Sequence, residues 1–286
     1  VLDVMVQGVV RMLKFEDREV QKIAIAALGS TAFESDEERT LVRDSGVLPL
    51  VYKLLDEDDD TLLLDALRVF SEMTSHGSGH SLKQYVIDLG TLRVLPSLMK
   101  KKAKSSSVIQ NSCRLIRNVM EGNEDQKEAV ISNGLLTLIV KIIQTGDSEI
   151  QYNCSWALCN LVANCTKAQF LSLLAEKPIA AFSVALRDLD GRDDYYDPNT
   201  RINVLTVIDK LLSTVNSNQM NTFKNEAREA GLIRHLKKMR KNKDEEVRGF
   251  ASDILSEYFT ENDEEEANET RNNKEKAKKT VQKRKR

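Results

Sequence analysis

Several residue types are scarce in this 286-residue sequence, and each scarcity excludes a class of protein. Four unevenly spaced cysteines without a CxxC pair are too few for the disulfide framework of a secreted domain, so we expect mostly buried free thiols. The sequence has no long apolar run and no signal peptide with a charged and then an apolar region, so we expect that the protein is neither secreted nor membrane-spanning. Lys plus Arg (42) nearly balance Asp plus Glu (44), so composition gives no reason to expect nucleic-acid or membrane partners.

Catalytic and cofactor-binding motifs are also missing. The sequence contains no glycine-rich phosphate loop, no nucleophile elbow and no HExxH motif. Of the three histidines, His76 and His80 share a Ser/Gly-rich turn, but two ligands without a third nearby are a weak metal site. We therefore expect no enzyme activity, no metal and no cofactor.

An internal repeat is what the sequence does contain. Glycine recurs at Gly46, Gly90, Gly134 and Gly231, after a small or polar residue at all but Gly90, and each time before an apolar helical segment. The first three glycines are 44 residues apart, and one further step reaches Pro178, which suits a first helical turn. The longer step to Gly231 is explained by an insertion near 188–200 that contains Tyr195 and Tyr196. This period is typical of armadillo and HEAT repeats.

The internal layout of each period favours the armadillo class. An apolar helix follows the glycine, then a polar linker, a longer helix, and a brief third helix such as 125–132; HEAT repeats have two helices. The predicted fold is therefore an all-α, right-handed superhelical armadillo solenoid over residues 1–259. It has about six units: 1–45 (without a clear first helix), 46–89, 90–133, 134–177, 178–230 and 231–259. Residues 260–286 form an acidic and then basic tail that we expect to be disordered.

The long helices of successive armadillo units line one concave face, so residues at equivalent places form columns along it. In one unit, Trp156 and Asn160 are four residues apart and share a helical face. A Trp face can pack a lysine stem and attract its ammonium group, and an Asn amide can hold an extended peptide backbone. Alternatively, Trp156 is a packing residue and Asn160 a surface amide.

This W-x-x-x-N phrase resembles the importin-α family of nuclear import adaptors. The stretch 114–134 is similar to a middle repeat of that family in which Arg114 stands where other repeats have Trp, and 246–259 is similar to its last repeat. The resemblance implies an armadillo fold, basic peptides of the nuclear-localisation type as ligands, an importin-β-like carrier as a partner, and a cytoplasmic and nuclear location.

The columns depart from the family pattern in most units. The Trp column contains Ala26, Arg68, Arg114, Trp156, Thr206 and Asp253, and the Asn column contains Ser30, Glu72, Asn118, Asn160, Lys210 and Glu257. In the third unit, the residues assigned to the two columns could each be shifted by one position. Only one unit keeps the full Trp–Asn pair, whereas the family's principal signal-binding site has several consecutive pairs. The predicted peptide-binding residues are Trp156, Asn160, Arg114, Asn118, Arg68 and Glu72.

The preferred hypothesis is an importin-α-like adaptor that binds basic peptides non-covalently. The alternatives are an armadillo scaffold outside nuclear transport, which contacts a folded or acidic partner through Arg68 and Arg114, and an armadillo-type heat-shock cochaperone. The acidic run 56–60 is read as an inter-helix linker that could also attract basic cargo. The basic tail fits a localisation signal, a peptide that folds back into the groove, or a solubilising segment.

Overall fold

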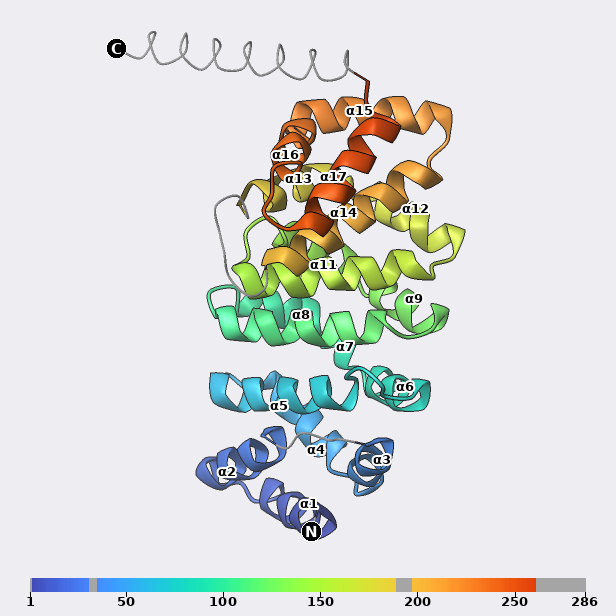
Figure 1. Ribbon diagram of the computed structural model, residues 1–286. Coiled ribbons are helices and arrows are strands. Elements are labelled where there is room, and N and C mark those ends of the chain that lie inside the picture. Colours follow the sequence, from blue (N-terminus) through green and yellow to red (C-terminus); the bar gives the residue numbers. More distant parts are fainter. Residues whose placement is uncertain (1, 31–34, 189–196, 261–286) are drawn as a thin grey trace, which may run out of the picture. The chain divides into compact units, whose positions relative to one another are not determined.

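The protein is described by a computed structural model that covers residues 2–30, 35–188 and 197–260 (Figure 1). Every regular element in these ranges is a helix, as predicted. Most of the predicted insertion and the tail after residue 260 lie outside the described residues. The elements are α1 Leu2–Leu13, α2 Arg18–Gly29, α3 Asp36–Asp44, α4 Leu48–Lys53, η1 Leu54–Asp56, α5 Asp60–Met73, α6 His80–Asp88, α7 Thr91–Lys101, α8 Ser106–Met120, α9 Glu124–Ser132, α10 Leu135–Ile142, α11 Ser148–Ala163, α12 Lys167–Ala175, α13 Pro178–Asp188, α14 Asp197–Thr214, α15 Ser217–Ala230, α16 Leu232–Met239 and α17 Glu245–Tyr258.

The chain divides into two compact parts, called unit 1 and unit 2 below, each of which contains several of the predicted repeats. Unit 1 comprises Val1–Ile139 with Ala163–Phe170, and unit 2 comprises Val140–Val162 with Leu171–Arg286. The three-helix layout predicted from the repeat recurs along the chain: a short helix (α3, α6, α9 and α12, with α15 in the same place but 14 residues long), a middle helix after it, and a long helix (α2, α5, α8, α11, α14, α17). The predicted unit 1–45 contains three helices, α1, α2 and α3, so the expectation that it lacks a clear first helix was wrong: α1 is the apolar helix that precedes the long helix.

The recurring glycines end one helix and allow the next to begin. Gly46, Gly90, Gly134 and Gly231 have φ angles of 75°, 89°, 72° and 79°. This left-handed conformation is inexpensive only for glycine, which has no Cβ. At the fourth step of the repeat Pro178 begins α13, as predicted, and its ring fixes φ near −65°. The left-handed position therefore moves one residue earlier, to Lys177, with φ 50°.

Lys177→Gly should raise the stability of the protein by about 1 kcal/mol, because it removes a left-handed non-glycine residue. The measurement is the shift of the chemical denaturation midpoint. Gly134→Ala is the matched control: a Cβ there has no heavy atom within 4 Å, so only the backbone conformation opposes it. This control should destabilise by about the same amount. A midpoint that moves the same way in both variants would contradict the argument.

Three buried cations in unit 1 repeat with the same period as the glycines. Arg39, Lys83 and Lys127 lie 44 residues apart, one on each of α3, α6 and α9, and are 6%, 2% and 2% exposed. Each donates to a carbonyl at the end of a long helix, where intrahelical donors run out. The bonds are Arg39 Nε to Glu72 O (3.2 Å), Lys83 Nζ to Asn118 O (2.9 Å) and Lys127 Nζ to Asn164 O (2.8 Å). These side chains hold each short helix against the end of a long one.

The linkers before the long helices of unit 1 are joined by ion pairs. The acidic run 56–60 lies between basic groups on both sides, and Asp59 also caps α5 by accepting from Thr61 N at 2.9 Å. The pairs are Arg18–Glu57 (2.8 Å), Lys22–Asp59 (2.9 Å), Lys102–Asp60 (2.6 Å) and Lys101–Asp58. The run thus forms a linker that leads into α5 and supplies negative charge to the N-terminus of that helix. Four of its five carboxylates already have a basic partner, which weakens the expectation that they attract basic cargo.

Among the described residues, no single helix is both long and apolar enough to cross a membrane; only α12 and α13 taken together, with a sharp bend between them, pass on length and composition.

Candidate functional site

The exposed positions on the long helices are the predicted ligand-binding columns, and we call this surface the ladder. In unit 1 the ladder is carried by α2, α5 and α8, which pack in succession (Figure 1). Close approach of α2 to α5 depends on Gly29, because a Cβ there would lie 3.1 Å from the Asp65 carbonyl oxygen. Ala26 and Ser30 leave the α2 part of the ladder without charge, so the chemistry of unit 1 is concentrated on α5 and α8.

The charged residues of the unit 1 ladder are organised as two ion pairs. Arg68 Nη1 lies 3.0 Å from Asp65 Oδ1 within α5, and Arg114 Nη2 of α8 lies 2.8 Å from Glu72 Oε1 of α5. Burial raises the pKa of the Asp65 carboxyl and outweighs the lowering effect of Arg68. Three of the residues predicted to bind peptide, Arg68, Glu72 and Arg114, therefore lie together, and two of them form a bridge between neighbouring repeats.

Asn118 occupies a different position from the one expected of a ligand-holding amide. It is 5% exposed, its Nδ2 donates to Ser71 O of α5 at 2.9 Å, and its Oδ1 accepts from the Arg117 guanidinium at 3.2 and 3.3 Å. The Ser71 carbonyl lies in the last turn of α5, where backbone acceptors need other donors. At this turn of α8 the half-exposed residue is Arg117, one residue before Asn118. The predicted column could be shifted by one residue in this repeat, and Arg117 is the residue that the shifted column contains.

In unit 2 the ladder begins on α11 with an aromatic pair. The Trp156 residue is 38% exposed, and its ring centroid lies 5.5 Å from that of Tyr152 at a tilt of 58°. Asn160, one turn further along, is half-exposed. Tyr152 was not recognised in the sequence, although its spacing of four residues from Trp156 was the available signal. An accessible indole face supported by a second ring can accept an aliphatic stem and its cation.

The last part of the unit 2 ladder, on α14 and α17, carries the acidic residues Asp209, Asp253 and Glu257 together with the exposed Lys210. Burial raises the pKa of the Asp209 carboxyl, with further contributions from Glu257 and Asp253. Burial, a hydrogen bond to Glu257 and the nearby Asp209 raise the pKa of Tyr258 to about 12. Of the other column residues, Thr206 bonds its own helix at Ile202 O.

The histidine turn offers no metal site. His76 Nδ1 contacts the Glu121 carboxylate, and His80 Nδ1 lies 3.4 Å from Gln126 Oε1. Within the described ranges no group of three or more His, Cys, Asp or Glu residues could hold a metal ion. None of the four cysteines is in a disulfide, and Cys113 and Cys154 are buried.

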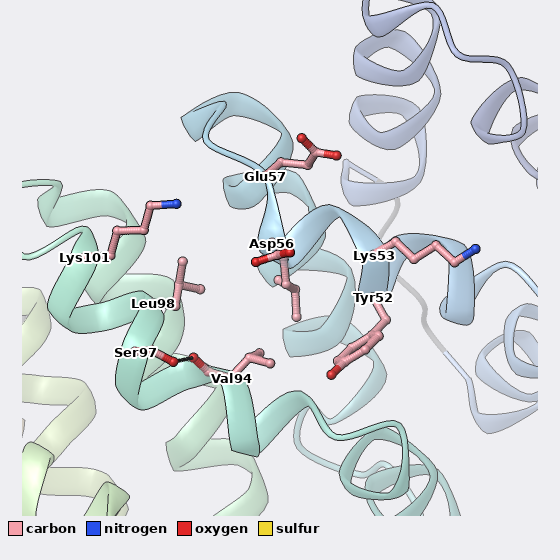
Figure 2. A pocket seen from close by; sticks show the side chains of 9 residues that line it. Tyr52, Lys53, Asp56, Glu57, Val94, Ser97, Leu98 and Lys101 are labelled. Atoms are coloured by element: carbon pink, nitrogen blue, oxygen red, sulfur yellow. Dashed lines mark hydrogen bonds between the residues drawn. The ribbon is translucent and has the colours of Figure 1, made fainter.

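A hollow of about 540 Å³ lies in unit 1 between two middle helices, the α4–η1 segment and α7 (Figure 2). Its lining mixes charges of both signs with apolar groups: Tyr52, Lys53, Leu55, Asp56, Glu57, Val94, Ser97, Leu98 and Lys101. Glu57 is held by Arg18, and Ser97 Oγ donates to Val94 O at 3.2 Å. No set of functional groups converges in this hollow, so the ladder remains the better candidate site.

Comparison with solved structures identifies the architecture. A computationally designed armadillo repeat protein for modular peptide recognition matches 89% of this chain and 100% of its own, with a TM-score of 0.74 and 23% identity. A designed armadillo repeat protein in complex with the peptide (KR)4 matches 88% of this chain and 98% of its own, with a TM-score of 0.72 and 22% identity. The chain has the armadillo-repeat solenoid fold.

Sequence comparisons agree with this armadillo-repeat assignment. Residues 80–120 and 123–163 match the Armadillo/beta-catenin-like repeat family. Importin subunit alpha-2 of Caenorhabditis elegans is 36% identical over 116 residues, which are 41% of this chain and 21% of that protein. Importin subunit alpha-1a of Oryza sativa subsp. japonica is 28% identical over 137 residues, 48% of this chain and 26% of that protein. The matched region thus spans about a quarter or less of these relatives' length.

Proposed function

We propose that this armadillo-repeat chain is a non-catalytic adaptor that binds extended peptides on its ladder, and that unit 2 selects lysine and arginine side chains as importin-α-like adaptors do. The observation that carries the proposal is the exposed Trp156 face on α11, with Tyr152 beside it and Asn160 one turn away. A lysine stem packs on the indole while its ammonium group is attracted to the ring.

The charge of unit 2 supports the same specificity. Asp209, Asp253 and Glu257 outnumber Lys210 on the final long helices, and a further ammonium or guanidinium group would relieve their mutual repulsion. The similarity to two importin α subunits and to a designed protein bound to (KR)4 points in this direction. An importin-β-like carrier and a cytoplasmic and nuclear location follow only if the nuclear-transport role holds. A scaffold outside nuclear transport, or a heat-shock cochaperone, would share the fold and differ in ligand.

The test is a fluorescence-anisotropy titration of a labelled peptide of alternating Lys and Arg. Trp156→Ala should weaken its binding about tenfold, because the cation–π contact and the packed stem are lost together. Leu171→Ala is the matched control, since Leu171 is a 46% exposed apolar residue on the short helix α12 and not on a long helix. Equal affinity for wild type and Trp156→Ala, or no binding to wild type, would overturn the proposal.

A further inference from the structure

Large apolar side chains are exposed on the first two helices of unit 1. Val4 on α1, Phe15 in the following turn and Ile23 on α2 are 73%, 61% and 63% exposed. The last long helix, α17, has no exposed apolar side chain, since its exposed residues are Glu245, Glu246, Gly249, Asp253, Ser256 and Glu257. A terminal repeat of a solenoid is expected to have a polar outer face of that kind. The α1–α2 face instead has the composition of an interaction surface.

The register of Ile23 on its helix indicates what packs there. Ile23 lies six residues after the N-cap Asp17, and the residue at the same place in α5, counted from the N-cap Asp59, is Asp65. Asp65 faces the preceding long helix, because its carbonyl oxygen would lie 3.1 Å from a Cβ at Gly29 of α2. Ile23 therefore points away from α5, toward the place of a helix stacked on the other side of α2.

Ala27, one turn after Ile23 on the same face of α2, is also exposed. The residues at the same distance from the N-cap in α5, α8 and α17 are buried: Val69 (0%), Leu115 (0%) and Ile254 (1%). The α2 face thus continues the stacking interface that joins the long helices, and it carries one large and one small side chain at the stacking positions.

The sizes of these two side chains favour a second copy of the chain as the occupant. If two α2 helices pack antiparallel about a two-fold axis, Ile23 of each copy lies opposite the partner's Ala27, so a large side chain meets a small one twice. Antiparallel packing also places the positive end of each helix dipole beside the negative end of the other.

The charges around this face agree with a second copy. The exposed charged residues of α1 and the turn after it are of both signs: Asp3, Arg11, Lys14 and Glu16. Those of α2 are already in ion pairs, Arg18 with Glu57 and Lys22 with Glu19 and Asp59. Neither sign prevails, so the face does not select a strongly basic or acidic partner, whereas a second copy can oppose each charge with one of the other sign.

We infer that the α1–α2 face is a two-fold interface between copies of this chain, with Ile23 and Ala27 at its centre and further apolar surface from Val4 and Phe15. Two helices from each copy make a small interface, so the dimer belongs to the weak, concentration-dependent class. The inference goes beyond the proposed function and does not involve Trp156.

Sedimentation of the full chain over a concentration series up to about 100 µM tests the inference. Wild type should pass from monomer to dimer and stop there, because a two-fold contact closes on itself. Ile23→Glu should weaken association more than about tenfold, since each copy would bury a carboxylate in apolar surface. Its circular dichroism should be unchanged, because Ile23 is exposed in the single chain. The matched control Leu171→Glu, at a 46% exposed position on α12, should leave association within about twofold.

Cross-linking tests the pairing of the two helices. Ile23→Cys and Ala27→Cys chains should form more disulfide-linked dimer when mixed than either forms alone, because position 23 of one copy faces position 27 of the other. Wild type controls for the half-buried native thiols of Cys159 and Cys165.

Three results would overturn the inference. A wild type that stays monomeric would leave the face to a helix of a different protein. A dimer that survives Ile23→Glu would have its interface elsewhere, and assembly beyond the dimer would indicate head-to-tail stacking. Trp156→Ala should leave the dimer unchanged, so dimerisation and peptide binding can fail separately.

Discussion

Replacing Lys83 with methionine should lower the free energy of unfolding by about 3 kcal/mol, because it breaks a buried ion pair from one side. Lys83 Nζ donates to Asn118 O at 2.9 Å and lies 2.8 Å from Glu121 Oε2, and only 3% of its side chain is exposed. Methionine fills a similar volume but donates nothing, so the carbonyl at the end of α8 and the Glu121 carboxylate both lose a partner. Chemical denaturation followed by circular dichroism measures the loss.

The pH dependence of this loss follows from Glu121. Burial raises the pKa of Glu121, but the hydrogen bonds from Lys83 and His76 lower it more, so the net pKa lies below the ordinary 4.5. A carboxyl with a lowered folded-state pKa contributes stability that is present above 4.5 and is lost as the pH falls through the folded-state value. The difference between wild type and Lys83→Met should therefore shrink on acidification to the part due to the Asn118 carbonyl.

Two further variants test the reasoning on Lys83. Gln84→Met, on the neighbouring residue of α6, removes only a surface bond to Asp88 and should change stability by less than about 0.5 kcal/mol. Lys83→Met/Glu121→Met should recover part of the loss, since replacing both partners of a buried pair by apolar groups is less costly than removing one. A loss below about 1 kcal/mol for Lys83→Met would show that water replaces the lost donor.

The fold was predictable because its determinants are local and periodic. Gly46, Gly90 and Gly134 each need a left-handed conformation between two helices, and their spacing along the chain is enough to define the repeat length. The same period runs through Arg39, Lys83 and Lys127, but the sequence does not reveal which carbonyls they reach. Those acceptors lie 33 to 37 residues further along the chain, and only the packing of short helices on long ones brings them into contact.

The candidate site was less predictable because it depends on distances between helices. Helical spacing places Asn118 one turn after Arg114, but it does not show that α5 comes close enough for the Asn118 amide to bond Ser71 O. Nor does it show that Glu72 and Arg114, 42 residues apart, neutralise each other. Trp156 was easier to select, because its spacing from Asn160 lies within a single helix, but its 38% exposure depends on how the neighbouring helices pack.

Phe182→Ala is expected to have the largest effect on stability, about 3–5 kcal/mol, because it opens a cavity at a fully buried aromatic. Phe182 is 0% exposed, and its helix α13 packs against α14, α15 and α16 within unit 2. In repeat proteins stability is close to a sum of repeat and nearest-neighbour terms, so this loss should remain largely local. Hydrogen exchange followed by mass spectrometry should accelerate about 100-fold in α13–α16, as a loss of about 3 kcal/mol implies.

Phe70→Ala provides the matched variant, since Phe70 is also 0% exposed but lies on α5 in unit 1. It should accelerate exchange in α2, α5 and α8, and leave α14–α17 protected. The two variants should thus produce opposite exchange patterns, and their thermal unfolding should broaden because one unit unfolds before the other. If hydrogen exchange accelerated equally over both units in either variant, the repeats would unfold as one cooperative block. Local destabilisation could not then be used to separate the unit 1 and unit 2 parts of the ladder.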